Sequence, residues 1–231
     1  MGAVTAETIY SSMEECGSLY NEELERHVFE VSLPETRANI TYLFFKRAFD
    51  VVVSAVLIIL LSLPMAIIAL LVRLDSPGPA LFRQERLGKG GQPFAMLKFR
   101  SMQLDAEENG PQWADRDDFR CTHLGRILRK SRLDELPQLW NILKGDMSFV
   151  GPRPERAYFY DEFETYLHGF RNRLLVEPGL TGWAQVNGGY DLRPEEKIIY
   201  DMEYIQSRSL WMDLRCIFKT VGLVFTHEGA R

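Results

Sequence analysis

Residues 51–72 read VVVSAVLIILLSLPMAIIALLV, an apolar run of 22 residues without a single charged side chain. As a helix, this run would be about 33 Å long, which is enough to cross the hydrocarbon core of a bilayer. Helices buried in soluble proteins rarely extend so far without a charge. The run therefore predicts a membrane helix, and it decides what kind of fold the rest of the chain can adopt.

Two features argue against a simple crossing of the membrane. Pro64 lies past the middle of the run, where it removes a backbone hydrogen bond and bends or breaks the helix. The hydroxyl of Ser62 is the nearest group that can satisfy the backbone at such a kink. Basic residues flank both ends of the run: Lys46, Arg47 and Arg73. Because basic residues favour the cytoplasmic side, we expect a re-entrant, kinked helix at about residues 46–73 with both ends on that side.

The composition of the whole chain is that of an ordinary globular protein. With 231 residues, 46% hydrophobic and 26% charged, it is long enough for one large domain and is neither disordered throughout nor collagen-like. The net charge of -5 comes from residues 1–45, which contain eight Glu, no Asp or Lys and two Arg. We expect an acidic N-terminal extension at residues 1–44 and one near-neutral domain at residues 45–231, with no nucleic-acid partner.

The cysteines and the N-terminal residues indicate the compartment. Cys16, Cys121 and Cys216 lie far apart without metal-ligand spacing, which is typical of reduced thiols in a cytosolic compartment. Residues 1–45 are acidic and lack a continuous apolar core, so they do not resemble a signal peptide. A single-pass chain with its body outside the cytoplasm is therefore disfavoured.

Beyond the apolar run, the pattern predicts a small body. Residues 80–86 and 94–102 flank a glycine-rich turn and predict a β-hairpin. Helices are expected at residues 116–130, 155–170 and 194–207. Residues 209–225 predict an amphipathic helix that either packs on the core or lies in the membrane interface. The polar side of this helix is expected to carry Asp213, Arg215 and Lys219.

The stretch SRLDELPQLWNILKG, residues 131–145, predicts a helix that starts with an acidic pair. Ser131 is the expected N-cap, and Gly145 is placed to end the helix. Asp134 and Glu135 would then lie at the helix N-terminus, where the unpaired N–H groups and the helix dipole favour negative charge.

Basic residues are dense around this pair: Lys98, Arg100, Arg126, Arg129, Lys130, Arg132 and Arg153. Arginine binds phosphate oxygens through two parallel hydrogen bonds, and flanking prolines hold Arg153 in place. An acidic pair among arginines could bind Mg²⁺ and a diphosphate, and a carboxylate can also attack phosphorus. The alternative is that Asp134 and Glu135 only complement the helix dipole while the arginines face anionic lipid headgroups.

Five stretches of the sequence, taken in order, closely resemble one known family. They read FKRAFD, LDSPGPALFRQERLG, KFRSM, LRKSRLDELPQLWNILKGDMSFVGPRP and PGLTGWAQVNG, and the match extends from about Phe45 to Phe225. They are similar to the bacterial sugar transferases, the monotopic phosphoglycosyl transferases. The block DELPQLWNILKGDMSFVGPRP is long and highly specific, so the resemblance favours a catalytic acidic pair over one that only complements the dipole.

The resemblance implies an enzyme that transfers a sugar 1-phosphate from a UDP-sugar to a polyprenol (undecaprenyl) phosphate. This would be the first membrane step in making an exopolysaccharide, capsule, O-antigen or glycoprotein glycan. Asp134 would be the nucleophile that carries the phosphosugar as a covalent aspartyl phosphate. Glu135 would help to place Mg²⁺, with Asp134 as the second metal ligand. Arg129 and Arg153 match the family's basic positions around the phosphates, and Lys98 is a looser match.

The implied fold is α/β, mostly α. It combines a re-entrant kinked membrane helix, interfacial amphipathic helices and a small body with a short β-hairpin, on the cytoplasmic face of the bacterial inner (plasma) membrane. Membrane lipid is an expected partner, and a homodimer is left open. Two features depart from the family: Leu63 separates Ser62 from Pro64 where members often have Ser-Pro, and residues 1–44 match nothing in the minimal catalytic unit. The alternative function is a non-catalytic membrane scaffold of a glycan assembly complex, against which the intact acidic pair argues.

Overall fold

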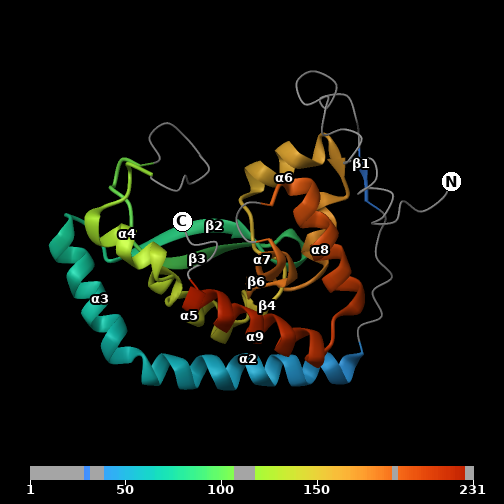
Figure 1. Ribbon diagram of the computed structural model, residues 1–231, viewed down its shortest axis with the longest axis horizontal. Helices are drawn as coiled ribbons and strands as arrows, with labels where there is room; N and C mark the ends of the chain where they lie inside the picture. Colours follow the sequence, from blue (N-terminus) through green and yellow to red (C-terminus); the bar gives the residue numbers. More distant parts are fainter. Residues whose placement is uncertain (1–28, 32–38, 107–117, 189–191, 227–231) are drawn as a thin grey trace.

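The computed structural model describes residues 29–31, 39–106, 118–188 and 192–226 of the chain (Figure 1). Most of the expected acidic extension, residues 1–44, lies outside the described residues. Within it, β1 (Phe29–Glu30) pairs in parallel with β5 (Leu167–His168) of the body. The last residues of the extension, from Ile40 onwards, already belong to the first long helix.

The apolar run forms two helices that meet at a sharp bend, α2 (Ile40–Leu60) and α3 (Ser62–Asp75). The two are bent by 63°, and α3 rises from the end of α2 along the side of the molecule (Figure 1). Pro64 accounts for the break, because it cannot donate to the carbonyl four residues earlier and its ring would clash with that carbonyl. The hydroxyl of Ser62 donates to the carbonyl of Ile59 at 2.8 Å.

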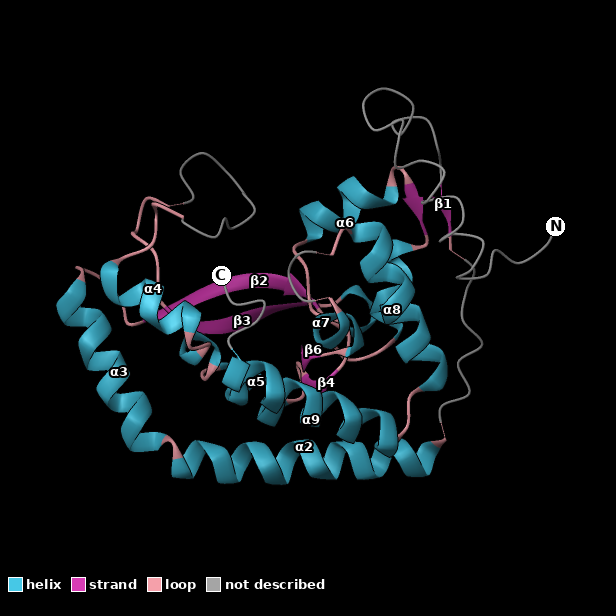
Figure 2. Ribbon diagram, in the orientation of Figure 1, coloured by secondary structure: helices cyan, strands magenta, loops and turns pink. Residues whose placement is uncertain are grey.

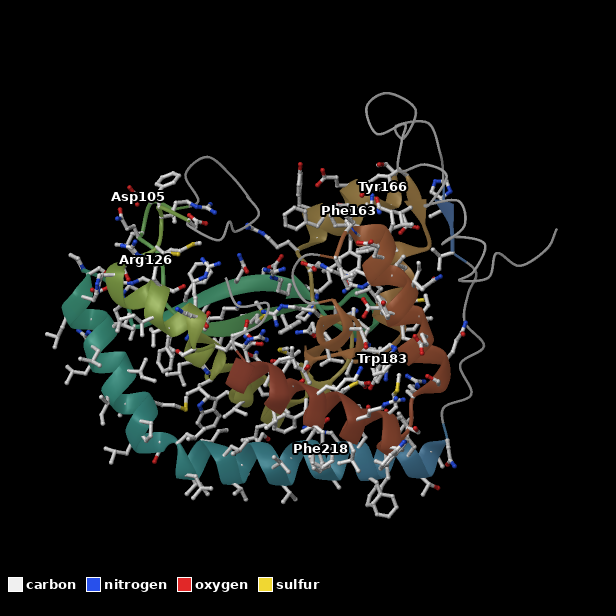
Figure 3. All side chains as sticks on the ribbon, in the orientation of Figure 1. Asp105, Arg126, Phe163, Tyr166, Trp183 and Phe218 are labelled. Carbon is white, nitrogen blue, oxygen red and sulfur yellow. The ribbon has the colours of Figure 1, made fainter. Side chains whose placement is uncertain are left out.

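The outer sides of these two helices are apolar. Among the described residues, no single helix is long and apolar enough to cross a membrane, whereas α2 and α3 taken together have the required length and hydropathy. The exposed large side chains include Phe44, Val52, Ile59, Leu60, Leu63, Ile67, Leu70 and Leu74. Figure 3 shows side chains that project from α2 and α3 on the side away from the body. Soluble monomers rarely expose so much apolar surface, so this face is suited to an apolar environment.

The body that lies against α2 consists of short helices and small sheets (Figure 2). β2 (Leu81–Leu87) and β3 (Pro93–Phe99) form the antiparallel hairpin that the sequence predicts, around the 3-10 turn η2 (Lys89–Gly91). β4 (Ser148–Val150) pairs in parallel with β6 (Gly179–Thr181). The helices are α4 (His123–Lys130), α5 (Gln138–Lys144), α6 (Ala157–Glu164), α7 (Trp183–Asn187), α8 (Pro194–Ser207) and α9 (Leu210–Thr226). Two more 3-10 turns are η3 (Leu133–Glu135) and η4 (Phe170–Leu175).

Two helices of the body are shorter than expected, and one has the expected bounds. The helix predicted at 116–130 is α4, which starts late because the side chain of Thr122 caps it by accepting from the backbone N–H of Gly125 at 2.9 Å. The helix predicted at 155–170 is only α6, and Gly169 with φ 94° interrupts the remainder. The helix predicted at 194–207 is confirmed as α8.

Three apolar clusters hold the described part of the chain together. The largest joins α6, η4, α8 and α9 and includes Phe163, Phe170 and Tyr204. A second cluster lies between α3, α4 and β3, and a third lies between α5, β3 and β4 with side chains of α2 packed against it. The two smaller clusters therefore attach both arms of the bent helix pair to the hairpin and its neighbours.

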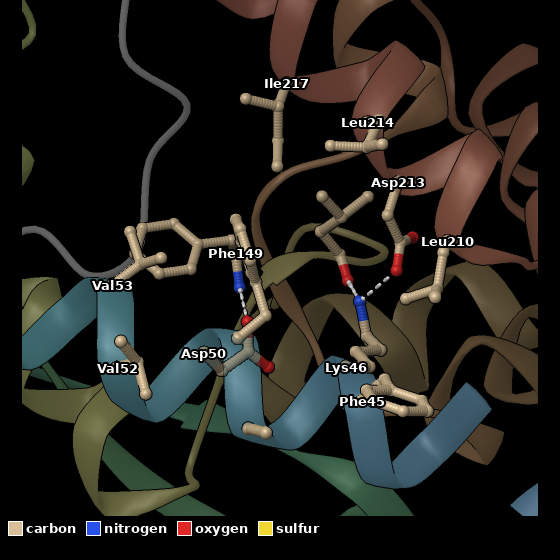
Figure 4. A pocket seen from close by; sticks show the side chains of 13 residues that line it. Phe45, Lys46, Asp50, Val52, Val53, Phe149, Leu210, Asp213, Leu214 and Ile217 are labelled. Atoms are coloured by element: carbon tan, nitrogen blue, oxygen red, sulfur yellow. Dashed lines mark hydrogen bonds and ion pairs between the residues drawn. The ribbon is translucent and has the colours of Figure 1, made fainter. Parts of the chain in front are cut away.

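A buried polar cluster attaches α2 to the C-terminal helix (Figure 4). Lys46 Nζ donates to the carbonyl of Val150 and to Asp213 Oδ2, each at 2.9 Å. Asp213 also accepts from the hydroxyls of Tyr42 at 3.0 Å and Tyr204 at 2.7 Å. The expectation that Asp213 faces away from the core is therefore wrong. Apolar periodicity cannot distinguish a charge that faces water from one that is paired inside.

The rest of α9 leaves an apolar side uncovered. Trp211 is 73% exposed and Phe218 is 70% exposed, while Cys216 and Met212 face the core. Arg215 and Lys219 are exposed, as the sequence predicts. The two expectations for this helix are therefore compatible, because it packs on the core through one side and presents apolar side chains on another.

Contacts from α2 also position the helix that follows the acidic pair. Arg47 donates to the carbonyls of Ile142 and Leu143 at 2.7 and 2.8 Å and so caps the C-terminus of α5. Asp50 accepts from the backbone N–H of Phe149 at 3.1 Å, beside an apolar cavity of about 440 Å³ between α2, β4 and α9 (Figure 4). α2 thus holds both α5 and β4, the two elements next to the acidic pair and Arg153.

Candidate active site

The acidic pair lies in a tight turn between α4 and α5. Ser131 follows the last residue of α4, and its hydroxyl donates back to the carbonyl of Ile127 at 2.8 Å. Arg132 is left-handed, with φ 58°, and the chain then enters η3, which contains Asp134 and Glu135. The expected N-cap role of Ser131 is therefore wrong, because its hydroxyl serves the helix before it. Gly145, with φ 100°, ends α5 as expected.

Glu135 is clamped by two cations. Lys98 Nζ on β3 donates to Glu135 Oε1 at 3.1 Å, and Arg153 donates to both oxygens of the same carboxylate. Burial favours the protonated acid, but the charges of Arg153 and Lys98 outweigh it and hold the pKa of Glu135 well below its usual range. Glu135 is therefore a permanently charged group that orients two positive side chains next to Asp134.

Asp134 is in the opposite situation. Its residue is 6% exposed, and no hydrogen bond or ion pair within the described residues reaches its carboxylate. Burial and the charge of Glu135 raise the pKa of Asp134 to about 6, against the attraction of Lys98, Arg129 and Arg153. The neighbouring cations favour the ionised form of Asp134, as expected, and with a pKa of about 6 the carboxyl group remains mostly ionised at neutral pH although burial opposes it. A phosphorylated ligand that brought a cation with it would lower this pKa again.

Arg153 is held by the short sheet behind it. A Cβ on Gly151 would come within 2.3 Å of the carbonyl oxygen of Glu177, and one on Gly179 within 2.1 Å of the backbone nitrogen of Gly151. These two glycines therefore let β4 and β6 approach closely just before Arg153. The guanidinium of Arg153 lies 3.5 Å from the carbonyl of Leu180 on β6. The sheet thus directs the side chain of Arg153 towards Glu135.

Three of the other basic residues that the sequence singled out are divided between two places, while Arg126 and Lys130 are exposed on α4 and Arg132 is half-buried. Lys98 and Arg129 lie at the site: Lys98 pairs with Glu135, and Arg129 acts on the charge of Asp134 while donating to Cys121 Sγ at 3.1 Å. Arg100 does not belong to the site. It is buried and donates to the carbonyls of Ser76 and Pro77, where it secures the end of α3.

Behind Arg153 lies a buried charge network that sequence reasoning missed. Arg173 Nη2 donates to the carbonyl of Arg153 at 2.8 Å, and Arg173 Nε pairs with Asp201 at 2.7 Å. Glu155 pairs with Arg86 at 3.0 Å and with Lys197 at 3.1 Å. These charged residues come from distant segments of the chain, so no local sequence pattern predicts that they pair. The available signal was an ionisable residue, such as Asp201, at a helix position whose neighbours on the same face are apolar.

A metal ion fits this site only together with a substrate. Among the described residues, no group of three or more His, Cys, Asp or Glu side chains is arranged to hold an ion. The site offers the carboxylates of Asp134 and Glu135, and Glu135 already pairs with Lys98 and Arg153. Mg²⁺ in phosphate chemistry commonly takes one or two carboxylates and completes its shell with phosphate oxygens and water. The donor set is therefore compatible with Mg²⁺ delivered with a diphosphate.

The fold and the site together define the class: a bent apolar helix pair beneath a small, mostly helical body, with one buried acidic pair clamped by Lys98 and Arg153. A family model described as bacterial sugar transferase matches residues 41–227. The chain belongs to this family.

Characterised relatives carry closely similar names. The chain is 43% identical over 208 residues to the UDP-N-acetylgalactosamine-undecaprenyl-phosphate N-acetylgalactosaminephosphotransferase of Aeromonas hydrophila. The matched region is 89% of this chain and 49% of the relative. It is 40% and 45% identical to the UDP-glucose:undecaprenyl-phosphate glucose-1-phosphate transferases of Escherichia coli K12 and Caulobacter vibrioides, each over 80% of this chain. The chain spans 41% of the E. coli relative and 71% of the Caulobacter relative.

Proposed function

We propose that the chain transfers a sugar 1-phosphate from a UDP-sugar to undecaprenyl phosphate and so begins the synthesis of a bacterial surface glycan. The observation that carries the proposal is the acidic pair: a buried carboxylate without a partner in the described chain, Asp134, beside a carboxylate clamped by Lys98 and Arg153. The names of the relatives supply the donor, the acceptor and the group transferred.

In the first step, a carboxylate oxygen of Asp134 attacks the phosphorus that bears the sugar. A bond forms between this oxygen and the phosphorus, the bond from the phosphorus to the oxygen that bridges the two phosphates of the donor breaks, and UMP leaves with that bridging oxygen. In the second step, an oxygen of undecaprenyl phosphate attacks the same phosphorus and releases Asp134. This sequence is a ping-pong cycle with a covalent aspartyl phosphosugar.

The surrounding residues supply charge and orientation. Lys98, Arg129 and Arg153 offset the negative charge of the transferred group and of the departing UMP. Glu135 keeps Lys98 and Arg153 in place and retains a full negative charge throughout the neutral pH range. Asp134 and Glu135 would hold Mg²⁺. The ion would neutralise the charge of the donor's diphosphate and stabilise the leaving group.

The exposed apolar sides of α2, α3 and α9 support a position of the site at a membrane surface. We propose that the bent pair enters the cytoplasmic leaflet and leaves it on the same side, because both ends of the apolar run carry basic residues. A lipid acceptor and a soluble nucleotide donor can then reach one site in turn.

The proposal is tested with the full-length chain in detergent or lipid nanodiscs. UMP release is followed with Mg²⁺ and UDP-glucose, UDP-galactose or UDP-N-acetylgalactosamine, with and without undecaprenyl phosphate. We expect a burst of about one UMP per enzyme without acceptor and steady turnover with it. Asp134→Asn should abolish both, whereas Asp161→Asn, at an exposed ion pair on α6, should leave both unchanged.

Two results would contradict the proposal in different ways. Substantial turnover by the Asp134→Asn variant would remove the covalent mechanism. No UMP release by the unmodified chain with any of the donors would instead favour the non-catalytic scaffold.

A further inference from the structure

A row of three polar side chains runs along the buried face of the segment that carries the acidic pair. The backbone from η3 to α5 is right-handed helical throughout, since Leu136 and Pro137 between them have φ of -53° and -62°. Glu135, Gln138 and Asn141 follow one another at a spacing of three residues, so they lie on one side of this segment. All three face inward.

The two ends of this row are fully paired. Glu135 accepts from Lys98 and Arg153, as described above. Asn141 bonds the edge of β3, because its Oδ1 accepts from the backbone N–H of Leu97 at 3.0 Å and its Nδ2 donates to the carbonyl of Ala95 at 2.8 Å. These bonds fix the face of the segment against the hairpin.

Gln138, in the middle of the row, has no hydrogen-bond partner in the part of the chain that the structure describes. It is completely buried, and neither its Oε1 nor its Nε2 has a hydrogen bond to any described residue. Burying both ends of an amide without partners lowers the stability of a fold, and an apolar side chain of the same length would avoid that loss. An unpaired group at such a position calls for an explanation, which can be a catalytic role or a bound water or ion.

The position of Gln138 indicates what that role is. It lies one helical turn after Asp134, which also has no partner within the described chain. A sugar phosphate offers both kinds of partner that an amide needs, namely phosphoryl oxygens that accept hydrogen bonds and hydroxyl groups that donate them. A ligand attached to Asp134 would therefore complete the bonding of the buried amide beside it.

We propose that Gln138 contacts the transferred group, with its Nε2 donating a hydrogen bond to a phosphoryl oxygen of the sugar phosphate while that group is carried on Asp134. This inference rests on the function proposed above. It adds a neutral donor, on the helical segment that follows the nucleophile, to the three cations that surround the phosphate.

The test replaces Gln138 by Met, which has similar length and no hydrogen-bonding group. Because the two unpaired atoms disappear, Gln138→Met should melt at the same temperature as the unmodified chain or higher. Its UMP burst rate and its kcat should fall about 10- to 100-fold, the effect of removing one hydrogen bond to a charged group, while KM for the UDP-sugar changes less. Asn141→Leu is the matched control: it should melt at a lower temperature, and its activity per folded molecule should be unchanged.

Three outcomes would overturn the proposal. A Gln138→Met variant that melts lower but keeps its rate per folded molecule would show that the amide is structural, bridged by a buried water. A variant with an unchanged melting temperature and an unchanged burst would show that the amide does not contact the phosphosugar, although the proposed function would stand. If the unmodified chain releases no UMP, the proposed function fails and the role of Gln138 fails with it.

Discussion

At the acidic pair, two adjacent carboxyl groups have pKa values shifted in opposite directions. Glu135 is charged because Arg153 and Lys98 hold it, and this charge, added to burial, raises the pKa of Asp134 to about 6. Neighbouring acids whose environments separate their pKa values are a general mark of divided roles in catalysis. Here Glu135 orients the two cations, whereas Asp134 is available to attack phosphorus.

The raised pKa of Asp134 has a consequence for stability. Because the folded chain holds this proton more tightly than the unfolded chain, its stability falls as the pH rises from about 4 through 6. Asp134→Asn removes the uncompensated buried charge, so at pH 8 the inactive variant should melt a few degrees above the unmodified chain. The gain should shrink as the pH approaches 4. Thermal melts of both proteins from pH 4 to 8 measure it.

Glu135→Gln is the control, and we expect it to change the melting temperature in the opposite direction. The folded-state pKa of Glu135 is depressed, so its contribution is present at neutral pH and is lost only in acid. The variant leaves Lys98 and Arg153 without their carboxylate and should melt below the unmodified chain at pH 8. Equal melting temperatures for the two variants at pH 8 would contradict the opposite shifts.

Among the elements, α2 does more than provide an apolar surface. It contributes Lys46 to the buried pair with Asp213, caps α5 through Arg47 and holds β4 through Asp50. Each of these polar contacts comes from the first half of the helix, whereas the second half and α3 contact the body through apolar side chains and leave their outer sides exposed. Polar contacts therefore help to fix the position of the acidic pair relative to the bent helix pair.

Loss of one partner from the buried pair should be costly. Asp213→Asn leaves the Lys46 ammonium inside the fold without its counter-charge, which should reduce the free energy of unfolding by about 3–5 kcal/mol. The double variant Lys46→Met/Asp213→Leu should recover most of this loss, since neither charge remains. Denaturant unfolding of the single and double variants in detergent gives the coupling energy. A double variant no more stable than Asp213→Asn would contradict the assignment.

On the scale of the whole molecule, the membrane arrangement makes a labelling prediction. Thr41 and Asp75 lie exposed near the two outer ends of the bent pair. With Cys16 replaced by Ser, single cysteines at these two positions should both react with a membrane-impermeant thiol reagent in inside-out vesicles. Neither should react in right-side-out vesicles. Labelling of the two positions from opposite sides would show a crossing instead of a re-entrant pair.

The sequence predicts the elements of this molecule better than their contacts. The hairpin, α8 and the bend follow from strong local signals: alternation around glycines, a helical period and Pro64 in an apolar run. The acidic pair was also found from the sequence, because its segment matches a long family block. By contrast, the inward position of Asp213 and the burial that raises the pKa of Asp134 depend on residues far away in the chain.

The buried pair of Lys46 and Asp213 joins residues that are 167 positions apart. At a synthesis rate of about 5–20 residues per second, Lys46 emerges from the ribosome roughly 8 to 33 seconds before its partner exists. During that interval α2 has its apolar side ready for lipid while its polar side still lacks α9. The buried pair can therefore form only after α9 has been synthesised, so the C-terminal helix is the last element to be fixed against α2.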